Sequence, residues 1–153
     1  MKGKTHLEKH LREKIKSVLE ELKDPEERVL DKHGSNEYGL DLIIIKFDPF
    51  KKLRAYGVQI KTGDIKCSGR PSQKIKEIIG QLSIAFGKFV HIDGKDYKLD
   101  GFYVITNGRF LGNAEDYIRS ACIGIRNLHF IDGESLNEFF SKYGSVMKQF
   151  KET

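Results

Sequence analysis

Hydrophobic residues recur at spacings of three and four positions near the start of the chain, over residues 7–22. This spacing predicts an amphipathic helix that Asp24-Pro25 ends or turns away from. The same periodicity predicts a second helix over residues 75–86. Shorter helices are predicted over 115–122 and 136–143.

Runs of β-branched and aromatic residues between turn-forming residues predict the strands. The predicted strands cover residues 28–30, 39–45, 56–61, 89–91, 97–99, 102–106 and 128–131, and loops are predicted over 33–38 and 61–74. Asp48-Pro49 separates the two most apolar strands, and Asp93-Gly94 is typical of a tight hairpin turn. The order α-β-β-β-α-β-α-β-α predicts one domain of the α/β class, with a mixed sheet covered by helices.

Charged and amide side chains interrupt the two most apolar strands. Side chains on a strand alternate between faces, so Gln59 and Lys61 share one face and Val58 and Ile60 the other. If the two strands pair, Asp41 meets the face of Gln59. Burying such groups costs several kcal/mol unless they bind one another or a metal ion. We therefore expect a site in which Asp41 and the Gln59 carbonyl hold a hard divalent cation and Lys61 orients water near a phosphodiester.

The pair of motifs Gly39-x-Asp41 and Gln59-x-Lys61 resembles the PD-(D/E)XK nuclease superfamily, and most closely its Mrr-type restriction endonuclease branch. Two later stretches extend the resemblance over residues 7–140. They are the run from Asp100 to Asn113-Ala114, which includes Thr106-Asn107-Gly108, and the run Ile131-Asp132-Gly133 with Leu136. The resemblance implies a restriction-endonuclease-like fold with an α-β-β-β-α-β core.

The resemblance also implies further site residues. Family members often carry a metal-binding Glu on the first helix, about thirty residues before the Asp, and Glu8 matches that position. Related nucleases often direct a polar group from the second helix toward the site, and Gln81 matches it as a supporting residue. Most superfamily members carry Asp or Glu where this chain has Gln59, although Gln is usual in the Mrr-like branch. A neutral amide oxygen binds Mg²⁺ more weakly than a carboxylate does.

Charge and composition agree with a polyanionic partner. Lys and Arg number 27 against 22 Asp and Glu, for a net charge of +5 and an isoelectric point near 9.1. Lys66, Arg70 and Lys74 follow the Gln59 strand and are candidate phosphate contacts, although exposed lysines need no such role. Cys67 and Cys122 lack metal-ligand spacing and indicate reduced thiols in a cytoplasm. No run is apolar enough to span a membrane.

The sequence thus predicts a cytoplasmic, Mg²⁺- or Mn²⁺-dependent endonuclease that hydrolyses DNA, acts as a homodimer and uses no organic cofactor. Two alternatives stay open. The chain can be a nucleic-acid-binding module that kept the fold and lost the chemistry, since Gln59 and Lys61 also suit a solvated strand face. It can also be a structure-specific resolvase that cleaves branched DNA of the Holliday-junction type.

Overall fold

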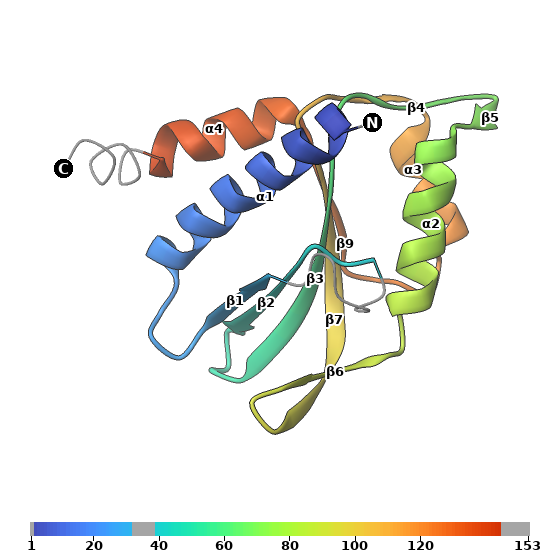
Figure 1. The fold of residues 1–153 in the computed structure, drawn as a ribbon. Coiled ribbons are helices and arrows are strands. Elements are labelled where there is room, and N and C mark those ends of the chain that lie inside the picture. Colours follow the sequence, from blue (N-terminus) through green and yellow to red (C-terminus); the bar gives the residue numbers. More distant parts are fainter. Residues whose placement is uncertain (1, 32–38, 145–153) are drawn as a thin grey trace.

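The computed structural model describes residues 2–31 and 39–144 of the chain, with side chains from residue 7 onward (Figure 1). The predicted loop over residues 33–38 lies outside the described residues. The helices are α1 (Lys2–Leu22), α2 (Gln73–Ala85), α3 (Ala114–Ala121) and α4 (Gly133–Tyr143). The strands are β1 (Arg28–Asp31), β2 (Leu42–Phe47), β3 (Leu53–Lys61), β4 (Ile65–Ser68), β5 (Arg70–Pro71), β6 (Phe89–Ile92), β7 (Lys95–Thr106), β8 (Phe110–Gly112) and β9 (Leu128–Ile131).

A mixed sheet forms the centre of the molecule. Its strands follow the order β1-β2-β3-β7-β6, and β9 pairs with the second half of β7. The pairs β3–β7 and β7–β9 are parallel, and the others are antiparallel. The carboxyl ends of β3, β7 and β9 therefore meet at one edge, where ligand sites of open α/β sheets are commonly found.

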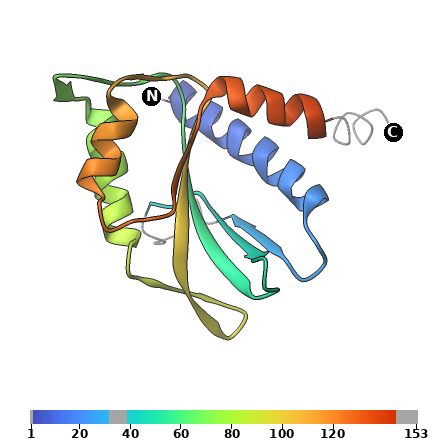
Figure 2. The same cartoon turned by 180° about the vertical axis from the view of Figure 1, so that it is seen from behind.

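Helices cover both faces of this sheet, with α1 and α4 on one face and α2 and α3 on the other (Figures 1 and 2). Alternation along β3 explains the two layers. Val58 and Ile60 pack with Leu11 of α1, whereas Ala55 packs with Ile78 of α2. The arrangement confirms the predicted mixed α/β fold and is compatible with the restriction-endonuclease-like fold.

The prediction of a loop over residues 61–74 is wrong. Ile65 and Cys67 are buried while Lys66 and Ser68 are exposed, which is the alternation of a strand. Strands β4 and β5 form a three-stranded sheet with β8, in the order β5-β4-β8. The pairing of β4 with β8 is parallel and joins distant segments, so the short run alone did not indicate it.

Two further boundaries differ from the prediction. Strand β2 begins at Leu42, so Asp41 lies immediately before the strand instead of within it. Strand β7 is continuous across the predicted break between residues 99 and 102. Cys67 and Cys122 are both buried and free. None of the helices in the described part of the chain is long and apolar enough to cross a membrane.

Candidate active site

Asp41 lies where the chain enters β2, beside the last residues of β3. The ladder between the two strands ends at the pair of Leu42 and Val58. The main-chain N–H of Asp41 donates to the carbonyl of Val58 at 2.8 Å, and its carboxylate Oδ2 accepts from the main-chain N–H of Ile60 at 2.7 Å. Gly39 has a φ of 75°, in the left-handed region that favours glycine. The carboxylate is thereby fixed against the end of β3.

Gln59 is buried on the side of β3 that faces α2. Its relative exposure is 1%, and it lies beside Val104 of β7. Among the described residues, neither Oε1 nor Nε2 of its amide has a hydrogen-bond partner. A buried polar group without a partner costs about 1–3 kcal/mol, so a ligand that engages this amide recovers that cost. Gln59 is therefore an unsatisfied polar group on the strand next to Asp41.

Lys61 shares this face of β3 and forms an ion pair with α2. Its Nζ lies 3.7 Å from Oε2 of Glu77, and the Lys61 side chain is 13% exposed while that of Glu77 is 51% exposed. The sequence did not indicate Glu77 as a site residue. In the sequence, Glu77 is an ordinary helix residue that follows two lysines and belongs to no recognisable motif. Only the packing of α2 on the sheet brings Glu77 to Lys61.

The face of α2 that contains Glu77 contacts the end of β3 and the residues before β2. One turn earlier, Nζ of Lys74 donates to the carbonyl of Thr62 at 2.6 Å. One turn later, Gln81 packs on Gly39, where an added Cβ would lie 2.6 Å from its Cγ. Gln81 thus lies beside Gly39, two residues before Asp41, and its role as a supporting residue stays a prediction. The ammonium of Lys74 is bonded to the main chain, and its predicted phosphate contact stays a prediction.

Hydrogen bonds between side chains and the main chain tie the loop that follows Lys61 to the end of β7 and the residues after it. Oγ1 of Thr106 donates to the carbonyl of Gly63 at 2.5 Å, and Oδ1 of Asn107 accepts from the N–H of Gly63 at 2.7 Å. The carboxylate of Asp64 accepts from the N–H of Arg109 at 2.9 Å. Sequence reasoning treated Asn107-Gly108 only as a turn and missed these positioning contacts, because they join segments more than forty residues apart.

Glu8 lies on α1 and is partly buried. Helix α1 packs against the face of β3 that contains Val58 and Ile60, whereas Gln59 and Lys61 belong to the opposite face. Asp41 thus lies beside the end of β3 that contains Gln59 and Lys61, whereas Glu8 belongs to the helix on the opposite face. Its role as a metal ligand stays a prediction.

Two of the predicted phosphate contacts lie on the small sheet. Lys66 on β4 and Arg70 on β5 both have exposed side chains. Strand β4 follows the end of β3 after three residues, so these cations extend from the rim of the candidate site. Their exposure suits contacts to a phosphate backbone.

The oxygen donors present suit a hard divalent cation. The carboxylate of Asp41 and the unpartnered amide oxygen of Gln59 are the ligand types that Mg²⁺ accepts, and Mg²⁺ commonly retains several waters. Within residues 2–31 and 39–144, no group of three or more His, Cys, Asp or Glu side chains is placed to hold a metal ion. The donors therefore fit a cation that has few protein ligands.

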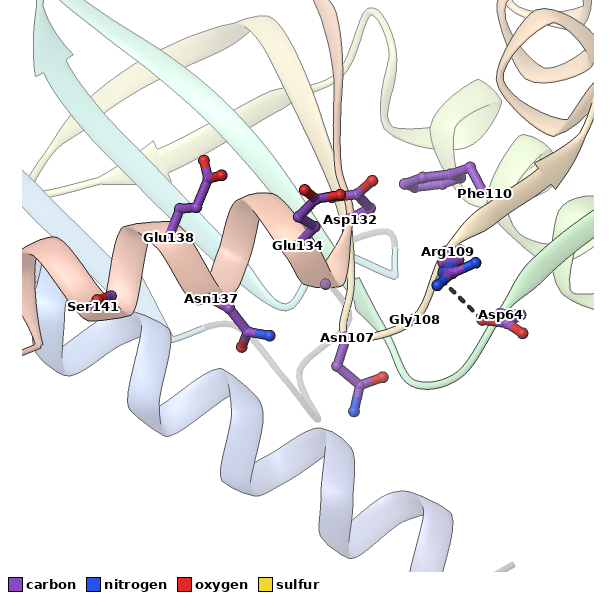
Figure 3. Close-up of a pocket in the computed structure, with 11 residues that line it drawn as sticks. Asp64, Asn107, Gly108, Arg109, Phe110, Asp132, Glu134, Asn137, Glu138 and Ser141 are labelled. Carbon is purple, nitrogen blue, oxygen red and sulfur yellow. Dashed lines mark hydrogen bonds between the residues drawn. The ribbon is translucent and has the colours of Figure 1, made fainter.

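A hollow of about 760 Å³ lies beside the start of α4 and the loop after β7 (Figure 3). The carboxylates of Asp132, Glu134 and Glu138 point to one side of it and the amide of Asn107 to the other. Asp132 already caps α4 by accepting from the N–H of Ser135 at 2.9 Å. Asp41, Gln59 and Lys61 do not line this hollow, so it is separate from the candidate site.

Comparison with known proteins gives one likeness. No protein-family profile and no curated protein sequence matches the chain. The chain is similar to a solved structure of the MspJI restriction endonuclease in complex with a 27-mer oligonucleotide, at 14% identity and a TM-score of 0.42. The match covers 84% of this chain and 26% of that one, so the chain spans about a quarter of the length of that structure.

Proposed function

We propose that the chain is a metal-dependent DNA endonuclease. The observation that supports this proposal is that the Asp41 carboxylate, just before β2, is held against the end of β3 that contains the unpartnered amide of Gln59 and the ammonium of Lys61. Asp41 and Gln59 provide oxygen donors, and Lys61 provides the positive charge next to them. DNA as the substrate follows from the Gly-x-Asp and Gln-x-Lys resemblance and agrees with the net charge of +5.

Each residue has a separate part in the proposed hydrolysis. Asp41 and Gln59 would hold Mg²⁺ or Mn²⁺, which supplies Lewis acidity for attack on the phosphodiester. Lys61 orients the attacking water and stabilises the negative charge that grows on the phosphoryl oxygens. Lys66, Arg70 and Lys74 bind the phosphates of the flanking nucleotides. A homodimer, which would present two such sites, belongs to the same proposal.

Nicking of supercoiled plasmid tests this function directly. Wild type is compared with Asp41→Asn and Lys61→Met, each with Mg²⁺, Mn²⁺ or EDTA. Asn keeps an acceptor for the N–H of Ile60 and removes only the charge, so the variant should fold. The control is Asp116→Asn, which changes an exposed carboxylate on α3. We expect metal-dependent nicking that falls at least 100-fold in the two site variants and is unchanged in the control.

A second candidate function is binding without cleavage. The neutral Gln59 and the lack of a three-carboxylate group in the described part of the chain favour it. Salt-sensitive DNA binding by wild type with no nicking in either metal would select this function. Cleavage of a four-way junction in preference to linear duplex would instead select the resolvase. Nicking that survives both site substitutions would show that the site is wrongly placed.

A further inference from the structure

Glu77 stands out because it is the carboxylate next to Lys61 and the sequence resemblance assigns it no role. We propose that Glu77 is a third oxygen donor to the divalent cation, supplied from α2 in place of the carboxylate that β3 lacks at Gln59. The inference rests on the proposed function and names a ligand of the same site.

The packing of α2 along β3 places Glu77 at the required level. Lys74 contacts Thr62, Glu77 contacts Lys61, and Gln81 contacts Gly39. Gly39 lies two residues before Asp41, and Asp41 is bonded to Val58 and Ile60, the neighbours of Gln59 in β3. The Asp41–Gln59 pair therefore lies near the turn of α2 that runs from Glu77 to Gln81.

The unpartnered amide of Gln59 is an independent sign of a ligand at this position. The side chain is 1% exposed and lies on the same face of β3 as Lys61, which contacts Glu77. A cation that binds between β3 and α2 would satisfy the Gln59 oxygen from one side and the Glu77 carboxylate from the other. The exposure of Glu77, at 51%, leaves its carboxylate able to turn between Lys61 and the cation.

The local charge favours another acid near Asp41. Asp41 and Lys61 have opposite charges that sum to zero, and the ammonium offsets part of the attraction that the carboxylate exerts on a divalent cation. Glu77 changes this sum to −1, and its pairing with Lys61 reduces the repulsion between the ammonium and the cation. Glu8, on the helix α1 that packs on the other face of the sheet, is the alternative third acid.

Binding of Mn²⁺ alone tests the assignment without any need for cleavage. The dissociation constant is measured by isothermal titration calorimetry for wild type, Asp41→Asn, Glu77→Gln, Glu8→Gln and Glu20→Gln. Glu20→Gln makes the same charge change at an exposed position of α1. We expect Asp41→Asn and Glu77→Gln to raise the dissociation constant about tenfold or more, and the control Glu20→Gln to stay within about twofold.

A double-mutant comparison separates direct ligation from an effect that acts through Lys61. If Glu77 binds the cation, Glu77→Gln weakens Mn²⁺ binding about tenfold in a Lys61→Met background as well. If Glu77 only holds Lys61, the effect disappears in that background and the inference is overturned. Thermal unfolding in EDTA checks that each variant folds.

The remaining outcomes distinguish the inference from the proposed function. Normal Mn²⁺ binding by Glu77→Gln, with weak binding by Asp41→Asn, overturns the role of Glu77 alone. Weak binding by Glu8→Gln but not Glu77→Gln assigns the third ligand to α1 and also overturns it. No Mn²⁺ binding by wild type overturns both the inference and the proposed metal-dependent function.

Discussion

At the scale of single residues, Gln59 is the least satisfied polar group of the candidate site. Its amide is buried with no partner in the described part of the chain, while Asp41 nearby accepts from Ile60. Stability alone would favour an apolar side chain of the same size at this position. The presence of Gln is therefore better explained by ligand binding than by folding.

Gln59→Met tests whether Gln59 lowers the stability of the fold while it contributes to ligand binding. Met has a similar volume and no polar atoms, so we expect the free energy of unfolding to rise by about 1 kcal/mol. Urea denaturation in EDTA measures this free energy. The same variant should bind Mn²⁺ more weakly than wild type. A loss of stability would mean that the amide has a hydrogen-bond partner and is not orphaned.

At the scale of elements, the turn between α1 and β1 is tied to the end of β2 by Glu27. Its carboxylate accepts from the N–H groups of Asp24 and Phe47, both at 2.9 Å, and lies 3.5 Å from Lys46. Burial acts to raise the pKa of Glu27, but the two main-chain hydrogen bonds and Lys46 outweigh it, so the pKa lies below its ordinary value.

A lowered pKa of Glu27 predicts acid sensitivity. The charged carboxylate contributes stability above the ordinary pKa of 4.5, and this contribution is lost as pH falls through the lowered pKa of the folded state. We expect acidification from pH 7 to pH 3 to reduce the free energy of unfolding less in Glu27→Gln than in wild type. Urea denaturation at both pH values measures the free energy of unfolding of each protein. Glu20→Gln, an exposed control, should lose as much as wild type does.

Close main-chain packing joins the end of β3 to the loop after β7. A Cβ added at Gly108 would lie 2.5 Å from the carbonyl carbon of Gly63, whereas one added at Gly80 of α2 meets no atom within 4 Å. We expect Gly108→Ala to lower the free energy of unfolding by about 2 kcal/mol and Gly80→Ala to raise it by up to about 1 kcal/mol. Chemical denaturation measures both. If the two variants have the same free energy of unfolding, the main chain near Gly108 accommodates a methyl group without loss of stability.

At the scale of the whole molecule, positive charges at its two ends should contribute differently to DNA binding. Lys66 and Arg70 lie on the small sheet near the candidate site, and Lys95 and Lys98 lie on the hairpin of β6 and β7. Figure 1 shows the small sheet and this hairpin at opposite ends of the molecule.

The salt dependence of binding measures these contributions. Each phosphate contact that is removed lowers the slope of log affinity against log salt by about 0.9. We expect the slope to fall by about 2 when Lys66 and Arg70 are both changed to Ala, and to stay the same when Lys95 and Lys98 are changed. Fluorescence anisotropy with a labelled duplex at several salt concentrations gives the slopes. A fall of equal size in both double variants would show that binding is spread over the whole surface.

The sequence by itself determined the main helices, the strands of the central sheet and the shared face of Gln59 and Lys61. These follow from local periodicity, because a side chain's direction on a strand or helix depends on its position along that element alone. The spacing of Gly39, Asp41, Gln59 and Lys61 also indicated a site before any packing was known.

Only the tertiary structure decided which groups from other elements reach that site. Strands β4 and β8 pair across more than forty residues, and Glu77 meets Lys61 only because α2 packs against the end of β3. Helix α1, to which Glu8 belongs, packs on the face of β3 that contains Val58 and Ile60. These contacts depend on how whole elements pack against one another, and local sequence patterns do not encode that packing.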